Sequence, residues 1–336
     1  MKVLVTAAFT DQGLDRLRNE LKMDVVYDPW RAHNRILMSD ELALRLQAEK
    51  AEAVILEVDL CHDEVFEAVD LKFVGCCRGE PLNVDVDTAT EKGVPVFFTP
   101  GRNADAVADL ALCFMLCHLR KVVPIHNLLT SGDFNPDSVD EFMAMLTGWT
   151  GFELGGRVVG IVGLGAVGSA VARRVKAFGS KIIAYDPFAP AERFSQFDAE
   201  KVELLDVFKR AGIVTLHAAD LDENQGMITR QHLAAMKPDA VFLNLARSSL
   251  VDNDALYEAL QNHRIAGAGL DVFSSEPPKK DDRFLSLDNV IVTPHVGGMT
   301  HDVIRHQTDI IIADVAAFLS GKKPRFCANP EVLKKK

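Results

Sequence analysis

The sequence predicts an α/β protein built from two doubly wound domains, each with a parallel sheet. The length of 336 residues suits about two domains, at roughly 150 residues each. Short apolar runs rich in β-branched residues alternate with helical patterns along the chain, which is typical of a parallel sheet covered by helices. A glycine-rich turn follows a strand in the second half alone, so that half is predicted to be a nucleotide-binding Rossmann domain.

The first half of the chain has the pattern of a complete α/β domain. Its expected strands are residues 3–6, 25–27, 53–57, 73–76 and 94–97, and its expected helices are residues 11–20, 39–49 and 85–91. No glycine-rich phosphate loop follows the first of these strands. We therefore expect this half to hold the substrate rather than the nucleotide.

The second half begins with an apolar helix at residues 103–119 and continues as the nucleotide-binding sheet. Six apolar runs predict its strands, at residues 158–162, 182–185, 213–216, 241–245, 266–271 and 290–292. This number suits a six-stranded doubly wound sheet. A last helix at residues 303–319 ends at Gly321, and Pro324 prevents its continuation.

The last helix suggests that one domain is discontinuous. If this helix packs back on the first half, residues 1–100 and 297–336 form the substrate domain, and residues 101–296 form the nucleotide-binding domain. Residues 131–156 read as an irregular stretch that is too long for a simple connection. We expect this stretch to be a functional loop or an arm that packs on a partner subunit.

The charge balance narrows the class of protein. The formal charge of −11 argues against a nucleic-acid partner, because phosphate binding needs a basic patch and the only long basic run is the lysine tail at 334–336. The N-terminal segment runs into Asp11 too soon for a secretory signal, and no window reaches the length of a membrane helix. A cytoplasmic protein without a membrane partner is expected.

Six cysteines in a chain of this length do not suggest a disulfide framework. Four lie in apolar segments and are predicted to be reduced, buried thiols: Cys76, Cys77, Cys113 and Cys117. The two sulfurs of Cys113 and Cys117 are predicted to lie on the packed face of an apolar helix, and no second ligand pair is visible. A metal site with His118 is therefore not expected.

A dinucleotide-binding fingerprint stands at the start of the second half. The strand at 158–162 runs directly into Gly163, Gly165 and Gly168 and then into an amphipathic helix. Gly163 permits the tight turn, Gly165 lets the backbone approach a pyrophosphate, and Gly168 lets the helix pack close to the sheet. The next strand ends at Asp186, whose carboxylate suits ribose hydroxyls and repels a 2′-phosphate, so NAD is predicted rather than NADP. The alternative is a tight turn without a ligand, followed by an Asp186 that caps the next segment.

Three polar side chains follow predicted strands of the second half and can meet at the carboxyl edge of its sheet: Arg247, Glu276 and His295. An imidazole titrates near neutrality, so His295 is the natural acid or base at the oxygen of a carbonyl group. Glu276 would fix its tautomer and stabilise the imidazolium, while the Arg247 fork can hold a carboxylate and polarise a carbonyl. Each residue taken singly also has a plain reading as a loop, turn or solvated residue.

Four motifs resemble those of the D-isomer-specific 2-hydroxyacid dehydrogenases, over nearly the full length of the chain. They are VGIVGLGAVG at 159–168, NLAR at 244–247, GLDVFSSEP at 269–277 and TPHVGG at 293–298. The resemblance implies that Arg247, Glu276 and His295 are catalytic and that the enzyme is a homodimer using NAD. It also implies a flavodoxin-like cap domain formed by the N-terminal segment and the C-terminal tail.

The resemblance extends to cofactor contacts outside the three glycines and Asp186. Expected contacts are Ala166 and Val167 at the helix start, His217, Ala218 and Ala219 after the third predicted strand, and Ala246, Arg247, Asp271 and His295 near the nicotinamide. No metal is implied.

Substrate contacts are expected in the turn after the strand at 73–76. Many members of the family have a glycine-rich turn there whose N–H groups hold the substrate carboxylate, but this turn reads CRGEPLNVD. Gly79 still permits a nest of amides and Arg78 adds positive charge, so both are predicted substrate residues. The alternative for Arg78 is a solvated turn residue. Asn103 resembles a family Asn close to substrate and hinge, and it also suits the N-cap of its helix.

The leading hypothesis is reversible hydride transfer between NAD and a small, polar or acidic 2-hydroxy or 2-keto acid, with His295 moving the proton. A sugar acid or a phosphoglycerate-like molecule would suit the charges of Arg78 and Arg102. Two alternatives stay open: an NAD-sensing binding protein similar to the corepressors of the family, and a phosphite- or formate-type dehydrogenase on the same scaffold. Glu276 argues against formate, whose oxidation moves no substrate proton through a His–Glu pair.

Overall fold

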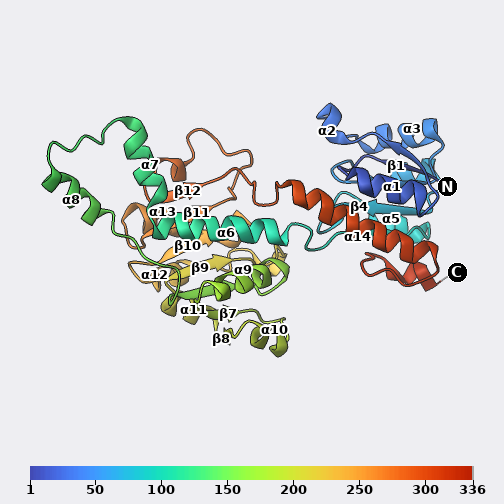
Figure 1. Cartoon of the computed structure of the whole chain (residues 1–336). Coiled ribbons are helices and arrows are strands. Elements are labelled where there is room, and N and C mark those ends of the chain that lie inside the picture. Colours follow the sequence, from blue (N-terminus) through green and yellow to red (C-terminus); the bar gives the residue numbers. More distant parts are fainter. Residues whose placement is uncertain (335–336) are drawn as a thin grey trace. The chain divides into compact units, whose positions relative to one another are not determined.

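The computed structural model describes residues 1–334 and divides into two compact units (Figure 1). Unit 1 consists of Met1–Asn103 together with the segment that begins at Thr300, and unit 2 is Ala104–Met299. Unit 1 is therefore discontinuous in sequence, whereas unit 2 is one continuous segment.

Unit 1 has a five-stranded parallel sheet in the order β2-β1-β3-β4-β5. Its strands are β1 (Lys2–Val5), β2 (Asp24–Tyr27), β3 (Ala53–Leu56), β4 (Phe73–Cys76) and β5 (Val96–Phe98). Every residue of β3 and β4 is buried, as expected for parallel strands covered on both faces by helices. The order is that of flavodoxin-like folds, so the prediction of a doubly wound sheet in this part of the chain is confirmed.

The helices of unit 1 are α1 (Asp11–Asn19), α2 (Trp30–His33), α3 (Ser39–Glu49), α4 (Asp63–Ala68), α5 (Val86–Glu91), α14 (His301–Leu319) and the 3-10 helix η4 (Pro330–Lys334). The last long helix, α14, buries Ile311, Ile312 and Val315 in the same apolar core as strands β1, β3, β4 and β5. The C-terminal tail is tied to the edge of the sheet, because Val96 N–H donates to Asn329 Oδ1 at 2.9 Å. Sequence-distant segments thus share one core.

Unit 2 has a seven-stranded parallel sheet in the order β12-β11-β10-β9-β6-β7-β8. Its strands are β6 (Val158–Val162), β7 (Lys181–Tyr185), β8 (Glu200–Lys201), β9 (Ile213–Leu216), β10 (Val241–Asn244), β11 (Gly267–Leu270) and β12 (Val290–Val292). The expected Rossmann order is present, with β12 added at one edge. The expectation of six strands is wrong because β8 pairs with β7 through two exposed residues that form no apolar run.

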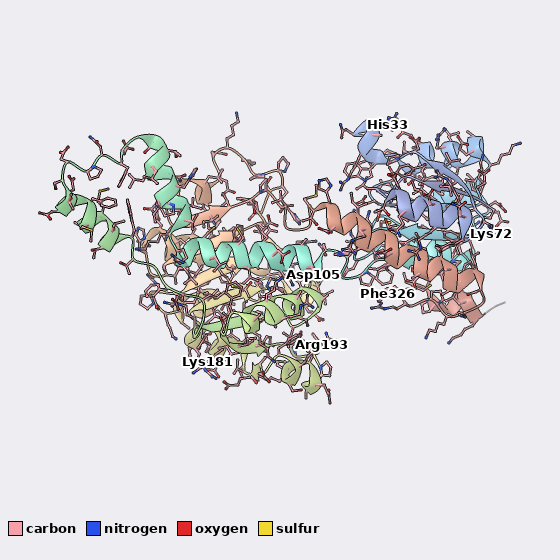
Figure 2. All side chains as sticks on the ribbon, in the orientation of Figure 1. His33, Lys72, Asp105, Lys181, Arg193 and Phe326 are labelled. Carbon is pink, nitrogen blue, oxygen red and sulfur yellow. The ribbon has the colours of Figure 1, made fainter. Side chains whose placement is uncertain are left out.

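Helices cover both faces of this sheet (Figure 1). They are α6 (Ala104–Leu119), α7 (Val122–Ser131), α8 (Val139–Gly148), α9 (Ala166–Ala177), α10 (Ala191–Gln196), α11 (Leu204–Arg210), α12 (Arg230–Ala234) and α13 (Asn253–Gln261), with 3-10 helices η1 (Asp222–Asn224), η2 (Ser248–Leu250) and η3 (Arg283–Ser286). Helices α6 and α9 pack together and are joined by Asp105, labelled in Figure 2, which accepts hydrogen bonds from Arg173 and Arg174. Within residues 1–334 no helix combines the length and the apolar character needed to cross a membrane.

Helix α6 corrects one expectation about the cysteines. Cys76 and Cys77 are buried, but Cys113 is exposed and Cys117 is half-buried, with the two Sγ atoms 4.0 Å apart. Phe114 and other apolar residues form the packed face instead. Because α6 is apolar on most of its circumference, its sequence does not show which face meets the sheet.

Residues 122–148, called the arm from this point, hold two helices, whereas the sequence predicts an irregular stretch from residue 131 to 156. Helix α8 is capped by Ser138, whose hydroxyl accepts from Glu141 N–H at 3.1 Å. Neither α7 nor α8 has a buried residue, although both sequences are largely apolar. Figure 1 shows α8 standing away from the sheet of unit 2. The exposed apolar side chains of the arm are Val122, Leu129, Val139, Phe142, Met143 and Leu146.

Candidate active site

The glycine-rich turn joins β6 to α9 and has the geometry that its sequence predicts. Gly163 adopts φ +89°, in the left-handed region that favours glycine. A Cβ on Gly168 would lie 2.0 Å from the Gly163 carbonyl oxygen, and a Cβ on Gly163 would lie 2.7 Å from the His217 backbone. A Cβ on Gly165 would meet nothing within 4 Å. Two glycines therefore pack tightly inside unit 2, and the third faces open space at the start of α9.

Asp186 follows β7 and is fixed beside this turn. Its Oδ2 atom accepts from Leu164 N–H at 2.7 Å, and Oδ1 accepts from the N–H groups of Phe188 and Ala189 at 2.9 Å each. Arg193, labelled in Figure 2, donates to the Leu164 carbonyl oxygen at 3.3 Å. The carboxylate of Asp186 therefore binds the N–H group of Leu164, and the guanidinium group of Arg193 binds its carbonyl oxygen.

His217 follows β9 and lies against the same turn. Its ring is half-buried, and removal from solvent lowers the pKa of the imidazole well below its usual value. The Nε2 atom lies 2.8 Å from Thr215 Oγ1 in a hydrogen bond. The next residues, Ala218 and Ala219, continue from the carboxyl end of β9, so this neutral histidine opens the stretch predicted to contact the cofactor.

Glu276 and His295 form a hydrogen-bonded pair, with 2.6 Å between Oε2 and Nδ1. An ionised carboxylate only accepts, so Nδ1 carries the proton that it donates. The Nε2 atom of His295 has no hydrogen bond within residues 1–334, and the two side chains are 40% and 38% exposed. The pair therefore offers one free imidazole nitrogen to a ligand.

The pKa of Glu276 lies below its ordinary value. Partial burial raises this pKa. The hydrogen bonds from His295 and from Phe273 N–H, together with the charges of His295 and Arg247, lower it by more than burial raises it. The carboxylate is therefore ionised through the neutral range and loses its charge only as the pH falls through the lowered pKa.

Asp271 holds the loop that carries His295. His295 has φ +58°, a left-handed conformation that is uncommon outside glycine. The buried Asp271 accepts from Thr293 Oγ1 at 2.6 Å and from Val296 N–H at 2.8 Å with Oδ1, and from Gly297 N–H at 2.8 Å with Oδ2. These bonds clamp the backbone on both sides of His295 and so set the direction of its imidazole.

Arg247 follows β10 in a turn that Asn244 shapes. Asn244 Oδ1 accepts from Ala246 N–H at 3.0 Å, and its Nδ2 donates to the Arg247 carbonyl oxygen at 2.9 Å. The half-exposed guanidinium donates from Nη1 to the Ala246 carbonyl oxygen at 2.8 Å, and Nε lies 3.8 Å from Asp220 Oδ2. Within residues 1–334 its Nη2 atom has no partner, so part of the fork can meet an anion.

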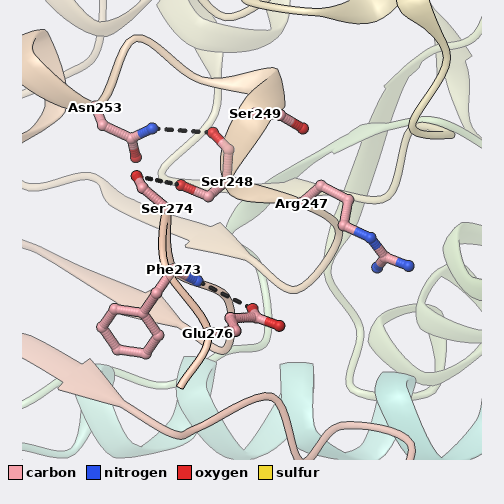
Figure 3. Close-up of a pocket in the computed structure, with 7 residues that line it drawn as sticks. All are labelled: Arg247, Ser248, Ser249, Asn253, Phe273, Ser274 and Glu276. Atoms are coloured by element: carbon pink, nitrogen blue, oxygen red, sulfur yellow. Dashed lines mark hydrogen bonds between the residues drawn. The ribbon is translucent and has the colours of Figure 1, made fainter. Parts of the chain in front are cut away.

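A hollow of about 380 Å³ lies between the loops after β10 and β11 (Figure 3). It is lined by Arg247, Ser248, Ser249, Asn253, Phe273, Ser274 and Glu276. Arg247 and Glu276 come from different loops and share this wall with hydroxyl and amide groups, of which Ser248 and Ser274 are hydrogen-bonded at 3.1 Å. The hollow has the size of a small-ligand site.

The predicted substrate residues of unit 1 lie after the carboxyl ends of two strands. Arg78 and Gly79 follow β4, and both are half-buried. A Cβ on Gly79 would meet nothing within 4 Å, so the turn is open at this point. Asn103 follows β5 and directly precedes α6, which begins at Ala104.

Comparison with known proteins decides the family. The family model described as D-isomer specific 2-hydroxyacid dehydrogenase, NAD binding domain, matches residues 112–297. The chain is 39% identical over 313 residues to the putative 2-hydroxyacid dehydrogenase YoaD of Bacillus subtilis, a match that covers 93% of this chain and 89% of that protein. This chain belongs to the D-isomer specific 2-hydroxyacid dehydrogenases. It is also 34% identical to the glyoxylate reductase of Pyrococcus furiosus, over 99% of this chain and 96% of that enzyme.

Solved structures share the fold over nearly the whole chain. The TT0316 protein of Thermus thermophilus is 31% identical with a TM-score of 0.80, covering 98% of this chain and 100% of that one. The D-lactate dehydrogenase with NAD+ from Lactobacillus jensenii is 27% identical with a TM-score of 0.79, covering 97% and 99%. The protein is an NAD-dependent oxidoreductase that acts on the CH–OH group of donors, which confirms the predictions of family, enzyme class and cofactor.

The open side of the glycine-rich turn fits NAD. The first turn of α9 has no side-chain cap, because its N-cap residue is Gly165, and the space before that residue is open. Free N–H groups at a helix N-terminus suit a pyrophosphate. The fixed Asp186 carboxylate suits a ribose diol and disfavours a 2′-phosphate.

We expect Gly165→Ala and Gly168→Ala to weaken NADH binding for different reasons. The methyl group at 165 fills only open space, so the unfolding temperature should stay unchanged while the Kd for NADH rises by about tenfold or more. The methyl group at 168 meets the Gly163 carbonyl oxygen, so stability and binding should both fall. Fluorescence titration and thermal unfolding measure the two effects, with Gly148→Ala in α8 as the control. Unchanged NADH binding by Gly165→Ala would show that no phosphate approaches this residue.

Three residues of the site were not predicted from the sequence as functional residues. Asp220 faces Arg247, Asn244 shapes the Arg247 turn, and Thr293 bonds to the residue that clamps the histidine loop. Asn244 and Thr293 each begin a quoted motif, and Asp220 directly follows the expected cofactor contacts at 217–219. Their positions along the chain therefore indicated that they lie near the site, but tertiary structure sets their hydrogen-bond partners.

Proposed function

We propose that this enzyme transfers a hydride reversibly between NAD and the C2 atom of a small D-2-hydroxy acid, with the 2-keto acid as the oxidised partner. The Glu276–His295 pair carries the proposal. Oxidation of an alcohol removes a proton as well as a hydride, and the pair presents one free imidazole nitrogen while an ionised carboxylate binds the other. The glyoxylate reductases among the relatives act on a small 2-keto acid, as their name says.

In the direction of reduction, bound NADH supplies the hydride to C2. His295 donates its Nε2 proton to the carbonyl oxygen, and Glu276 stabilises the imidazolium from which that proton comes. Arg247 binds the substrate carboxylate with its fork and polarises the carbonyl group. The 2-keto acid, NADH and one proton thus give the 2-hydroxy acid and NAD+, and oxidation runs through the same groups in reverse.

Further contacts complete the proposed site. We propose that the cofactor meets Gly163, Gly165, Ala166, Val167, Gly168, Asp186, His217, Ala218, Ala219, Ala246, Arg247, Asp271 and His295. The backbone N–H groups around Gly79, the charge of Arg78 and the amide of Asn103 are proposed to contact substrate. Residues 101–296 would then serve as the NAD-binding domain, and residues 1–100 with 297–336 as the cap.

Glu276→Gln is expected to lower the rate of 2-keto acid reduction by roughly tenfold or more and to change its pH dependence. The neutral amide no longer stabilises the imidazolium, so the pH above which reduction slows should move to a lower value. The lowered pKa of Glu276 predicts a flat profile in the wild type until the pH falls far enough to protonate that carboxylate. Profiles of kcat/KM against pH measure both limbs. Glu276→Asp keeps the negative charge, so the high-pH limb of its profile should stay at the wild-type pH. The same shift of this limb in both variants would contradict the assigned role.

A panel of 2-keto acids tests the proposed function. NADH oxidation is followed with glyoxylate, hydroxypyruvate, pyruvate and branched 2-keto acids, each at saturating cofactor. We expect turnover of at least one of these acids. Binding of NADH without turnover of any acid would contradict the proposal and favour an NAD-sensing binding protein.

We propose that the enzyme is a homodimer in which the arm packs on a second copy of the chain. Helices α7 and α8 have largely apolar sequences without a buried residue, and short helices with exposed apolar faces are marginal in water. An exposed apolar patch of this kind is typical of an interface.

Charging the arm should therefore dissociate the dimer. Phe142→Asp combined with Leu146→Asp places two carboxylates on α8, where the wild-type side chains are 37% and 41% exposed. Light scattering should give about twice the chain mass of 36.9 kDa for the wild type and the single mass for the variant. Asp140→Asn, at an exposed polar position of the same helix, is the matched control. A monomeric wild type, or a charged variant that stays dimeric, would argue against this interface.

We also propose a cytoplasmic location. All six cysteines are free thiols in the structure. Free thiols are typical of a reducing compartment.

A further inference from the structure

A carboxylate that the proposed reaction does not use lies beside Arg247. Asp220 is in the loop that follows β9, and Arg247 follows β10, the neighbouring strand of the unit 2 sheet. The Asp220 Oδ2 atom lies 3.8 Å from Arg247 Nε. Both residues belong to unit 2, so the distance between them is set within one compact unit. Loops after the carboxyl ends of parallel strands are the usual place for ligand contacts in such sheets.

The other oxygen atom of Asp220 fixes the carboxylate. Oδ1 accepts from Ser249 Oγ and from Gln225 Nε2, each at 2.9 Å. Gln225 belongs to the same loop as Asp220, whereas Ser249 lies in η2, which follows Arg247 (Figure 3). Because two donors hold Oδ1, Oδ2 is the atom that remains for the guanidinium group.

The two loops are also joined through their backbones. Gly226 N–H donates to the Ser249 carbonyl oxygen, and Ile228 N–H donates to the Leu250 carbonyl oxygen, each at 2.9 Å. Ile228 and Val251 form a parallel β-bridge. Backbone hydrogen bonds therefore hold the two loops together, and the ion pair between Asp220 and Arg247 is not needed for this.

The Arg247 side chain has few other restraints. Its Nη1 atom donates to the Ala246 carbonyl oxygen at 2.8 Å, and the side chain is 51% exposed. Among the residues that the structure describes, no group bonds to Nη2. A long side chain with this exposure has many rotamers, and binding of a substrate must restrict them. Asp220 attracts the Nε side of the guanidinium group and leaves the two terminal nitrogen atoms for an anion.

The charge of Asp220 has two opposite effects on an anionic ligand. It restricts the Arg247 guanidinium group, which favours binding, and it repels the ligand directly, which disfavours binding. The ligand contacts the terminal nitrogen atoms, whereas the carboxylate of Asp220 lies on the Nε side. We therefore expect the restriction to dominate while Arg247 is present. Without Arg247, only the repulsion remains.

We propose that Asp220 is a positioning residue for Arg247, which holds the guanidinium group at Nε and so presents its terminal nitrogen atoms to the substrate carboxylate. This role rests on the proposed reduction of 2-keto acids, in which Arg247 binds that carboxylate. It gives the loop after β9 a part in substrate binding, in addition to the cofactor contacts proposed for residues 217–219. Asp220 acts through Arg247 rather than on the reacting atoms.

A double-mutant cycle separates positioning from repulsion. Asp220→Asn removes the charge and keeps the size of the side chain, and it is made both in the wild type and in Arg247→Ala. In the wild type we expect kcat/KM for a monoanionic 2-keto acid to fall by about threefold to fivefold, as for a partly exposed ion pair. In Arg247→Ala the same change should raise kcat/KM by about threefold, because it removes only a like charge near the anion. The effect of the substitution thus changes sign.

Binding of oxamate gives the same comparison without turnover. Oxamate is an unreactive monoanion with a carbonyl group next to its carboxylate, and NADH fluorescence reports its Kd for the enzyme–NADH complex. Asp220→Asn should raise this Kd by about threefold to fivefold in the wild type and lower it in Arg247→Ala. This measurement serves if Arg247→Ala turns over too slowly for kinetics.

Two further variants distinguish the charge of Asp220 from its local packing. Asp220→Glu keeps the charge, so its kcat/KM should lie between those of the wild type and Asp220→Asn. Asp222→Asn is the matched control, at an exposed position on η1 where the carboxylate has no bond to any of residues 1–334. It should leave kcat/KM unchanged in both backgrounds. The unfolding temperature of Asp220→Asn should match the wild type, since the backbone bonds between the loops remain.

The outcomes separate this role from the proposed function. A fall of kcat/KM in both backgrounds would mean that Asp220 only supports local structure, and a rise in both would mean that it only repels the anion. Either result, or an unchanged wild-type value, would overturn the positioning role and leave 2-keto acid reduction standing. Absence of turnover with every 2-keto acid would overturn the proposed function itself, while the oxamate comparison would still test the ion pair.

Discussion

Replacing His295 with alanine is expected to lower kcat for 2-keto acid reduction by about 10²–10⁴-fold, the usual contribution of a positioned general acid. The His295 imidazole keeps its Nε2 atom free to donate a proton while Nδ1 is bonded to Glu276. Without the imidazole, only water remains to protonate the developing alkoxide. The glycine-rich turn, with Asp186, is untouched, so the Kd for NADH should change little. Stopped-flow reduction and fluorescence titration with NADH measure the two quantities.

His263→Asn is the matched control for this prediction. His263 is exposed, has a positive φ of +48°, and lies in the loop between α13 and β11, and asparagine tolerates that conformation. Its kcat should match the wild type. Added imidazole should restore part of the rate to His295→Ala, because a free imidazole can enter the vacated space. Retention of most of the activity by His295→Ala would mean that another group protonates the substrate.

Removing the Arg247 guanidinium is expected to lower kcat/KM by about 10³-fold, since an anionic substrate loses a charge-assisted contact made at the reacting end. Both KM and kcat should change, because the carboxylate is bound in the ground state and the carbonyl is polarised in the transition state. Arg247→Ala and Arg247→Lys are compared by steady-state kinetics. Lysine keeps the charge but not the planar fork, so its kcat/KM should lie between those of the wild type and the alanine variant.

The carboxylate of Asp220 adds to the expected effect of removing the Arg247 guanidinium. Asp220 lies 3.8 Å from Arg247 Nε, and its Oδ1 atom accepts from Ser249 Oγ at 2.9 Å. Gln225 Nε2 donates to the same Oδ1 atom at 2.9 Å, so the carboxylate remains in place when the guanidinium is removed. Its negative charge then lacks the nearby cation and should weaken the binding of an anionic substrate further. Arg264→Ala, at an exposed position of unit 2, is the control and should behave like the wild type. Equal KM values for the wild type and Arg247→Ala would show that the substrate carboxylate binds elsewhere.

Much of the fold follows from local patterns that the sequence displays openly. Most strands of both units are largely apolar runs of three to five residues. The glycine-rich turn needs its residue types for geometric reasons that hold in any context, as Gly163 and Gly168 show. The exception, β8, is a pair of exposed residues whose pairing with β7 carries no periodic signal. The helix α8 was not predicted, because the glycine and proline residues around it outweigh an apolar helical pattern that finds no partner within one chain.

The candidate site was predictable in its residue types and less so in its geometry. Strand-end positions single out Glu276 and His295. The 2.6 Å bond between them also needs the left-handed backbone at His295, on either side of which Asp271, in the loop after β11, accepts hydrogen bonds. The Glu57–Arg102 pair joins residues 45 positions apart, and no local pattern in the chain reveals it. Sequence thus indicates which groups are present at an edge, and tertiary hydrogen bonds decide where they point.

The most direct test of the central claim is the fate of a labelled hydride. The enzyme is supplied in turn with each of the two forms of NADH deuterated at C4 of the nicotinamide, together with its best 2-keto acid other than glyoxylate, whose product has no stereocentre at C2. The product is analysed by chiral chromatography and mass spectrometry. We predict a D-2-hydroxy acid that carries one deuterium at C2 with one of the two labelled forms. An L-product, or a hydroxy acid without deuterium from either C4-labelled form of NADH, would contradict the account.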